Sequence, residues 1–199
     1  MADIIQLRRD TAANWASANP ILAQGEPGIE LDTDNLKWGD GSTAWNSLNY
    51  AISRNRVWTT KTDVFTTTTT GSWIDVTGLS LSITPSSDTK KIRALAVIKC
   101  GGSSAAFLRL VRGSSAIGVG DTAGSRTPAG TSDLYDYYAR SDKIIAWIDD
   151  PMTNSEITYK VQCFLASSGT LRVGAMGSDD ADTAVRGRFA QFFELQEID

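Results

Sequence analysis

The chain has 199 residues, of which 41% are hydrophobic and 21% charged, and its formal net charge is −4. This composition is that of a folded protein with one domain or two small ones. An acidic balance without a basic run argues against duplex nucleic acid or an anionic membrane surface as a partner. Because the chain contains no histidine, the commonest general base and metal ligand is missing. We therefore expect no enzyme activity, no cofactor and no metal.

Residues 4–18 predict a short strand followed by a short helix. Residues 4–7 are suited to the strand, and the alanine-rich residues 11–18 to the helix. Asp10 or Thr11 can cap the helix, because a side-chain oxygen there accepts from free backbone N–H groups. Asn19-Pro20 ends it, since the residue before a proline is pushed out of the helical region.

The next residues predict a hairpin. Ile29 and Leu31 alternate with acidic residues, which predicts a half-buried strand with the two aliphatic side chains inside. Asp34-Asn35 has the chemistry of a turn, after which residues 36–38 return antiparallel. Residues 39–41, Gly-Asp-Gly, predict a second tight turn.

Residues 1–50 form a module that is too small to bury its large aromatic side chains, Trp15, Trp38, Trp45 and Tyr50. Chains of this size usually depend on disulfides, metals or oligomerisation. The module has no cysteine, so oligomerisation remains and we interpret it as an assembly module. Residues 51–56 are a short polar linker, and a second domain occupies residues 57–199.

The second domain predicts strands only. They are expected at residues 64–70, 73–76, 79–83, 91–100, 105–112, 116–119, 134–140, 143–149, 156–165, 170–176 and 189–198. Short strands at regular spacing with turn residues between them are typical of an antiparallel β-sandwich, and a jelly roll is the expected form. The whole chain is therefore assigned to the all-β class, with one short helix.

Four local patterns refine this prediction. Residues 156–165 alternate strictly, with Tyr159, Val161 and Cys163 on the buried side. Residues 91–100 are apolar on both faces, which indicates a central strand, and Thr77-Gly78 predicts a turn. The alternation of the last strand slips between Phe192 and Phe193, which a bulge or burial on both faces at a subunit contact would explain.

The two cysteines, Cys100 and Cys163, are both expected on buried strand faces. A disulfide is conceivable, but two buried free thiols are favoured because nothing else indicates a secreted disulfide framework. No apolar segment follows Arg8-Arg9, and no apolar run reaches about 18 residues. We therefore expect neither a signal peptide nor a membrane span, and synthesis in a cytosol without export.

Several side chains are candidates for binding. Tyr135, Tyr137 and Tyr138 offer amphipathic surface for sugars or proteins, although packing in the core or at a trimer axis would also explain them. Arg126, in the glycine-rich loop of residues 120–133, is a second candidate.

Two acidic segments contain oxygen ligands of the kind that bind metal cations. Residues 32–35, Asp-Thr-Asp-Asn, begin like a calcium loop but lack its later ligands, so a hairpin turn is favoured. Asp179, Asp180 and Asp182 could hold a cation, but such loop tips are usually only solvated.

The first module resembles the N-terminal module of bacteriophage tail-fibre and receptor-binding proteins, including the tropism-determinant family. The residues that carry the resemblance are Ile-Gln-Leu-Arg-Arg (5–9), Asn-Pro-Ile-Leu (19–22), Gly-Glu-Pro-Gly-Ile-Glu (25–30) and Lys-Trp-Gly-Asp-Gly-Ser-Thr-Ala-Trp-Asn-Ser-Leu (37–48). The resemblance implies a trimeric β-rich piece at the virion-proximal end of a fibre or spike. Residues 73–198 resemble trimeric jelly rolls of the C1q and tumour-necrosis-factor type in phage virion proteins.

These resemblances imply a phage virion protein of the tail-fibre or receptor-binding kind, a homotrimer that contacts other virion proteins and a host surface glycan. Virion attachment and trimerisation are assigned to Leu7, Trp15, Trp38 and Trp45. A capsid decoration or cement protein without host recognition is the alternative. A polysaccharide-degrading enzyme is the least favoured hypothesis. Phage spikes with that activity are generally long and β-helical, whereas this chain is short and its sequence shows no such repeat.

Overall fold

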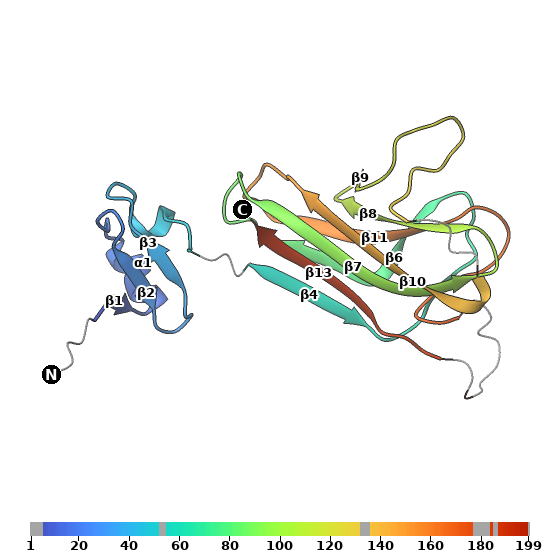
Figure 1. Ribbon diagram of the computed structural model, residues 1–199, viewed down its shortest axis with the longest axis horizontal. Helices are drawn as coiled ribbons and strands as arrows, with labels where there is room; N and C mark the ends of the chain where they lie inside the picture. The colour runs from blue at the N-terminus through green and yellow to red at the C-terminus, as the bar shows by residue number, and fades with distance from the viewer. Residues whose placement is uncertain (1–5, 52–54, 132–135, 177–183, 185–186, 199) are drawn as a thin grey trace. The chain divides into compact units, whose positions relative to one another are not determined.

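The computed structural model describes residues 6–51, 55–131, 136–176, 184 and 187–198, with the side chains of 136–141 not described. The chain divides into two compact units, Met1–Arg54 and Asn55–Asp199, which we call the N-terminal unit and the sandwich unit (Figure 1).

The N-terminal unit is a three-stranded sheet with two short helices. Its elements are β1 (Arg8–Asp10), α1 (Ala12–Ala18), β2 (Pro27–Glu30), β3 (Leu36–Trp38) and the 3₁₀ helix η1 (Trp45–Ser47). In the order β1-β2-β3, β1 runs parallel to β2 and β3 antiparallel to it. Of the strand expected at residues 4–7, residues 4 and 5 lie outside the described residues, and residues 6 and 7 are not part of a strand. The backbone that pairs with β2 is that of Arg8–Asp10.

The predicted helix is confirmed, including both of its ends. The Thr11 side chain accepts from the backbone N–H of Asn14, 3.2 Å away. Asn19 adopts a left-handed conformation at the other end, with φ 41°, and its N–H donates to the carbonyl of Trp15. A left-handed residue is a common way to close a helix, and Pro20 follows it directly.

The hairpin is confirmed, but the burial of its first strand is the reverse of the prediction. Glu30 is buried and Leu31, which follows β2, is exposed. Glu30 is tolerated inside because its carboxylate accepts from Thr33 Oγ1 and from the Tyr50 hydroxyl, the latter at 3.0 Å. Hydrogen bonds of this kind compensate a buried polar group for the contacts with water that it loses.

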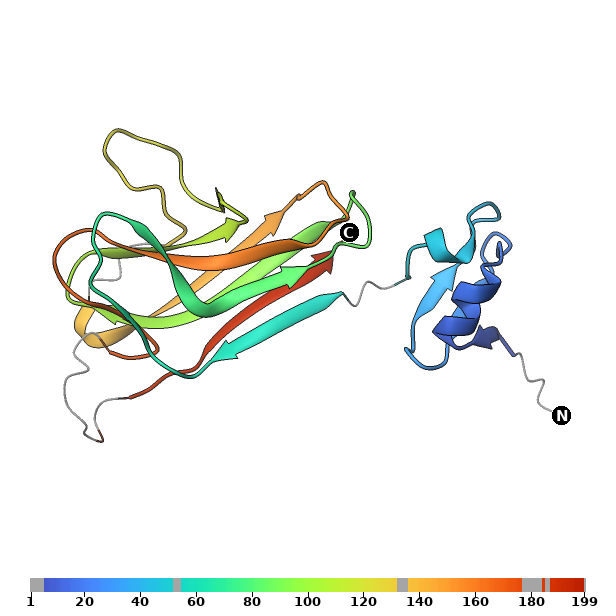
Figure 2. The same ribbon diagram turned by 180° about the vertical axis from the view of Figure 1, so that it is seen from behind.

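The sandwich unit consists of two sheets that lie one over the other (Figures 1 and 2). Its strands are β4 (Arg56–Lys61), β5 (Phe65–Thr67), β6 (Trp73–Ile83), β7 (Lys91–Gly102), β8 (Ala106–Arg112), β9 (Ser115–Ile117), β10 (Asp136–Asp149), β11 (Ile157–Leu165), β12 (Leu171–Val173) and β13 (Gln191–Ile198). One sheet has the order β4-β13-β7-β12-β5, with β10 also paired to β7, and the other β6-β11-β8-β9. All of these pairings are antiparallel, which confirms the all-β sandwich.

The core of the sandwich unit lies between the two sheets. It is supplied by alternate residues of the long strands, among them Ile98 on β7, Leu108 on β8, Tyr159 on β11 and Phe193 on β13. The predicted alternation of residues 156–165 and the central position of residues 91–100 are confirmed. Burial of this apolar surface is the main favourable term for such a domain.

The two cysteines are free and buried, as the sequence favoured. Cys100 and Cys163 belong to the same core. Burial raises the pKa of each thiol to about 12. Because the thiolate is the reactive form, neither side chain is suited to act as a nucleophile.

Residues 73–83 form one strand where a turn was expected. The register with β11 shifts between Lys160 and Gln162, so Thr77-Gly78 lies in a bulge of β6. Gly78 has φ +87°, a conformation that glycine adopts without strain. The strand continues because β11 offers backbone partners on both sides of the bulge.

Two further strand predictions need correction. Residues 136–149 are a single strand, β10, instead of two separated near residue 141, because β7 pairs with residues 141–149 and, after a shift of register, again with Asp136. Along β13 the register with β7 is unbroken from Phe192 to Ile198, which excludes a bulge, one of the two explanations offered for the slip of alternation. Phe193 faces the core, and the neighbouring Glu194 is buried on the other side of the sheet.

Among the described residues, no helix is both long enough and apolar enough to cross a membrane.

Candidate interaction surfaces

Two stacked tryptophans form the core of the N-terminal unit. The rings of Trp15, on α1, and Trp45, on η1, lie 4.1 Å apart between centroids and nearly parallel. The indole N–H of Trp15 donates to the carbonyl of Ile29 at 2.9 Å. A side chain at Gly28 would have its Cβ 2.5 Å from the Trp45 ring, so only glycine permits β2 to lie this close. Both tryptophans are buried.

A buried lysine connects this core to the aromatic side chain of Tyr50. Lys37 Nζ donates to the carbonyl of Trp45 at 2.9 Å and lies 4.3 Å from the centre of the Tyr50 ring. Burial lowers the pKa of Lys37, and the nearby Glu30 offsets only part of this shift. Burial and the hydrogen bond to Glu30 raise the pKa of Tyr50. These groups satisfy one another, so we assign them to the stability of the unit.

The residues assigned to attachment therefore fall into two classes. The unit was expected to be too small to bury Trp15, Trp38, Trp45 and Tyr50, and this is wrong for Trp15 and Trp45, which are inside. Leu7 and Trp38 are exposed, Trp38 to 52%. The exposed apolar side chains of this unit are Leu7, Ile21, Leu31, Trp38 and Tyr50. The assignment of Leu7 and Trp38 to a virion contact stays a prediction.

The turn after β3 is held by a carboxylate. Asp40 accepts from the backbone N–H groups of Ser42 and Thr43, at 2.8 and 2.7 Å, and from the Thr43 hydroxyl at 2.5 Å. These bonds, led by the one from the Thr43 side chain, hold the pKa of Asp40 well below its usual value.

Acid should consequently weaken the N-terminal unit through Asp40. Because the carboxyl pKa is depressed in the folded state, the unfolded state takes up the proton first as pH falls below about 4. The stabilisation is complete above that pH and is lost as pH falls toward the folded pKa. We expect the thermal midpoint of this unit to fall less between pH 5 and pH 2.5 in Asp40→Asn than in wild type. Equal falls in calorimetry would contradict this role.

One depression in the N-terminal unit is bordered by β1, α1 and Pro20. It has a volume of about 90 Å³, whereas sites for small molecules commonly span about 300–1,000 Å³. Arg8 lies over the Trp15 ring at this depression, 5.1 Å from its centre, and pairs with Glu26 at 3.3 Å. The depression is too small for a ligand of that kind.

The residues assigned to receptor binding are only partly described. Tyr135 lies outside the described residues, and Tyr137 and Tyr138 belong to β10 without described side chains. Arg126 is exposed, in a turn where its Nη1 donates to the carbonyl of Ala123 at 3.2 Å. Asp179, Asp180 and Asp182 also lie outside the described residues. The proposed receptor contacts therefore stay predictions.

The structure brings together a surface that the sequence did not indicate, on the side of the six-stranded sheet that faces away from the core. It is defined by three rows that cross β4, β13, β7 and β10, in which the partners in a row lie beside one another. The rows are Thr60-Phe192-Val97-Ile144, Trp58-Glu194-Leu95-Ala146 and Arg56-Gln196-Arg93-Ile148. We call these residues the outer face.

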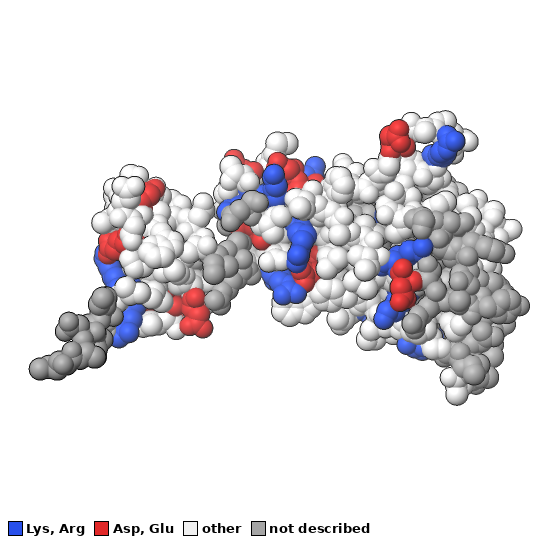
Figure 3. All heavy atoms as spheres, viewed as in Figure 1, with Lys and Arg blue, Asp and Glu red and all other residues white. Residues whose placement is uncertain are grey.

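Large apolar side chains on the outer face are exposed to solvent. Trp58 is 61% exposed, Ile144 66% and Ile148 56%, while Leu95, Val97 and Phe192 between them are half-buried. Figure 3 shows this side of the sandwich unit as an area with few charged atoms between two groups of charged side chains. A continuous apolar area of this kind on a soluble protein indicates a contact surface.

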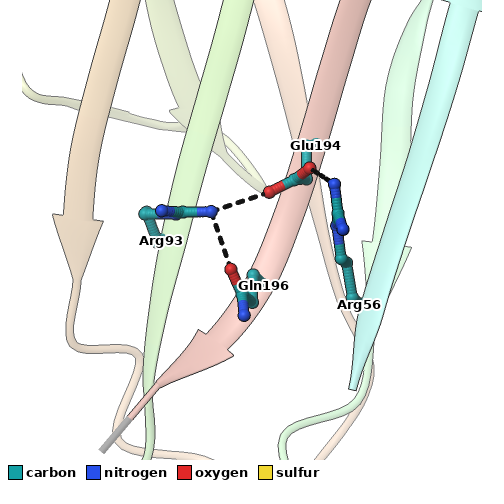
Figure 4. Close-up of polar contacts among 4 residues, drawn as sticks. All are labelled: Arg56, Arg93, Glu194 and Gln196. Carbon is teal, nitrogen blue, oxygen red and sulfur yellow. Dashed lines mark hydrogen bonds and ion pairs between the residues drawn. The ribbon is translucent and has the colours of Figure 1, made fainter. Parts of the chain in front are cut away.

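A buried carboxylate lies at the edge of this apolar area. The side chain of Glu194 is 2% exposed and accepts from Arg56 on one side and from Arg93, at 2.9 Å, on the other. Arg93 also donates to Gln196 at 2.7 Å. Figure 4 shows the two guanidinium groups on opposite sides of the carboxylate, from β4 and β7. The Arg56–Glu194–Arg93 triad holds the three strands in register and has a net charge of +1.

The sequence contained one signal for this surface, the slip of alternation at Phe192-Phe193. Burial on both sides of β13 was one of its two explanations, and the structure favours it. Glu194 is buried within the chain, however, by the arginines of neighbouring strands. Arginines 101 and 138 residues away in sequence supply this cover, so no local pattern could have found it.

The N-terminal part of the chain is similar to parts of known proteins. Residues 5–43 match the Major tropism determinant N-terminal domain. A curated relative, "Hyaluronoglucosaminidase" of Streptococcus pyogenes phage H4489A, is 41% identical over 46 residues, which are 23% of this chain and 12% of the relative. The matched segment thus spans about an eighth of that protein. These findings support the resemblance to a phage tropism-determinant module.

A solved structure is also similar in part, "Structure of infectious bursal disease virus Gx strain". It is 12% identical, the alignment covers 75% of this chain and 40% of that chain, and the TM-score is 0.33. The resemblance of residues 73–198 to C1q and tumour-necrosis-factor jelly rolls is not supported by these findings and stays a prediction.

Proposed function

We propose that this chain is a phage virion protein of the tail-fibre or receptor-binding kind. The N-terminal unit attaches it to the particle, and the sandwich unit contacts the host surface in three copies. The match of residues 5–43 to the tropism-determinant N-terminal domain is the observation that carries the proposal. The relative that shares 46 residues is itself a phage protein.

The modular arrangement supports an attachment role for the N-terminal unit. The shared segment is 12% of the relative, so a similar module occurs joined to a much longer remainder. In this chain the corresponding residues form a compact unit of their own. A module that is joined to different bodies is suited to a common task such as attachment, while the body determines what is contacted. The exposed Trp38, Ile21 and Leu31 provide apolar surface for a virion partner.

Binding without chemistry is part of the same proposal. The chain has no histidine, and both cysteines are buried with raised pKa values. Three copies acting together would allow a weak contact to a repeated surface glycan to retain the particle, because the second and third contacts form at high effective concentration. Release of sugar from host polysaccharide by the purified full-length chain would overturn this part.

Locating the protein on the particle tests the proposal. Antibodies against the sandwich unit, applied to particles that carry this chain, should label the tail end in electron micrographs. An even coat over the head would reject the tail assignment and favour the alternative, a capsid decoration protein. Host recognition is tested separately: the recombinant chain should bind host cells and compete with infection, and a chain that does neither would contradict it.

A further inference from the structure

We propose that the outer face is the surface through which copies of this chain join. The inference deepens the proposed function and rests on it only for the number of copies. The outer face belongs to a sheet whose other side is already covered by the β6-β11-β8-β9 sheet. Association through this face would give both sides of the six-stranded sheet an apolar partner, as sheets with apolar residues on both faces require.

The position of the exposed side chains fits a broad contact instead of a local one. Trp58 lies on β4 and Ile144 on β10, at opposite sides of the β4-β13-β7-β10 arrangement. The half-buried Phe192, Val97 and Leu95 connect them across the two strands between. The apolar area therefore crosses all four strands. Trp58 lies at one edge of this area, beside Glu194 and with the Arg56 guanidinium 5.6 Å from the centre of its ring. Aromatic and arginine side chains are enriched in protein interfaces.

The charges indicate that the partner must bring carboxylates. The Arg56–Glu194–Arg93 triad carries a net charge of +1, and its two guanidinium side chains remain 49% and 44% exposed. A purely apolar partner would bury that positive charge without compensation, which is costly. The partner is therefore expected to place an acidic group beside apolar residues.

The β10 strand of a second copy has the required pattern. Its outward positions are Ile144, Ala146 and Ile148, because alternate residues of a strand point to the same side. Asp150, directly after the strand, is exposed, so a carboxylate stands at the end of this row of three apolar side chains. If β10 of one copy lies over β4 of the next, apolar residues meet Trp58 and a carboxylate can reach Arg56. The outer face is in this sense complementary to itself.

The second edge of β10 also needs a cover. β10 has 14 residues, and among the described residues β7 is the strand that pairs with it. Long, flat edges with exposed apolar residues pair with other chains unless something covers them. A second copy packed on the outer face next to β10 would make this edge less accessible to other chains without pairing with it.

The mass of the full-length chain in solution tests the proposal. Light scattering after size exclusion should give a multiple of the 21.4 kDa chain mass. Ile144→Lys and Trp58→Lys should each weaken association by about 30-fold or more, the usual effect of losing an interface anchor. Met152→Lys is the matched control, because it adds the same charge at an apolar residue that is more exposed and lies outside the outer face. It should keep the wild-type mass.

Thiol labelling gives a second readout that does not depend on a disruptive charge. Ala146→Cys places the single accessible thiol on the outer face, since Cys100 and Cys163 are buried. Maleimide labelling should be slow in the assembled protein, speed up on dilution, and be fast when Trp58→Lys is combined with it. Met152→Cys should label rapidly at every concentration. Circular dichroism spectra like that of the wild type would show that the variants are folded.

Each of these measurements can contradict the outer face as the surface through which copies join. If Ile144→Lys and Trp58→Lys assemble like wild type, or if Ala146→Cys labels as fast as Met152→Cys, copies do not meet through the outer face and the proposed function stands. A wild-type chain that is monomeric at about 100 μM would overturn both this inference and the three-copy part of the proposed function. The location on the particle would then still test virion attachment.

Discussion

Replacing Trp45 by alanine is expected to unfold the N-terminal unit while the sandwich unit remains folded. Trp45 is 1% exposed and stacks on Trp15 at 4.1 Å, and its carbonyl accepts from the buried Lys37. Truncating a buried aromatic side chain costs about 3–5 kcal/mol. A unit of this size has a single small core whose net stability is about the same, roughly 3–5 kcal/mol. The loss therefore equals the whole stability of the unit.

Hydrogen exchange on the full-length chain is the appropriate measurement. In Trp45→Ala the amides of α1, β2 and β3 should lose their protection, whereas those of β7 and β11 should exchange at the wild-type rate. Trp38→Ala is the control, because it removes the same side chain from a position that is half exposed, and it should leave protection nearly unchanged. Loss of protection in β7 as well would show that the two units do not fold independently.

Phe193→Ala is expected to destabilise the sandwich unit by about 3–5 kcal/mol, since it leaves a cavity between the sheets. Phe193 is fully buried among residues of both sheets. The register of β13 with β7 places it beside Ala96, whose side chain points to the same core. The small neighbour means that the phenylalanine ring supplies much of the volume there, so the surrounding residues can fill the space only in part.

The adjacent Phe192 provides a matched control for this prediction. It belongs to the outer face and is half-buried, so Phe192→Ala should cost less than half as much. Urea unfolding of dilute protein measures both values, with the midpoint falling further in Phe193→Ala at an unchanged slope. If the two variants were equally destabilised, the register of β13 described here would be wrong.

Local sequence patterns predicted those elements whose cause is local. Thr11 and Asn19-Pro20 set the two ends of α1, because capping and the proline restriction act over a few residues. Asp34-Asn35 likewise set the hairpin turn. The period of two in residues 157–165 predicted which side of β11 is buried, since a long strand with a uniform pattern has one way to meet a core.

The predictions that were wrong concern residues whose partners lie far away in the sequence. Leu31 was expected inside and Glu30 outside, yet Glu30 is buried because the Tyr50 hydroxyl, 20 residues later, reaches its carboxylate. The turn expected at Thr77-Gly78 became a bulge because β11 pairs with both halves of β6. Among the candidate binding residues, the tyrosines at 135, 137 and 138 could be proposed from the sequence alone, whereas the outer face could not.

The sequence by itself determined the all-β class, the short helix, the free cysteines and the likeness of the first module to phage tropism proteins. These depend on composition, alternation and short motifs, each of which is complete within a few residues. Tertiary structure alone decided that Trp15 and Trp45 are inside and Trp38 outside, and that Arg56, Arg93 and Glu194 meet beside an apolar area. The reason is physical: burial and ion pairing depend on which strands become neighbours, and β4, β7 and β13 are joined by pairings between residues that are about 100 or more apart in the chain.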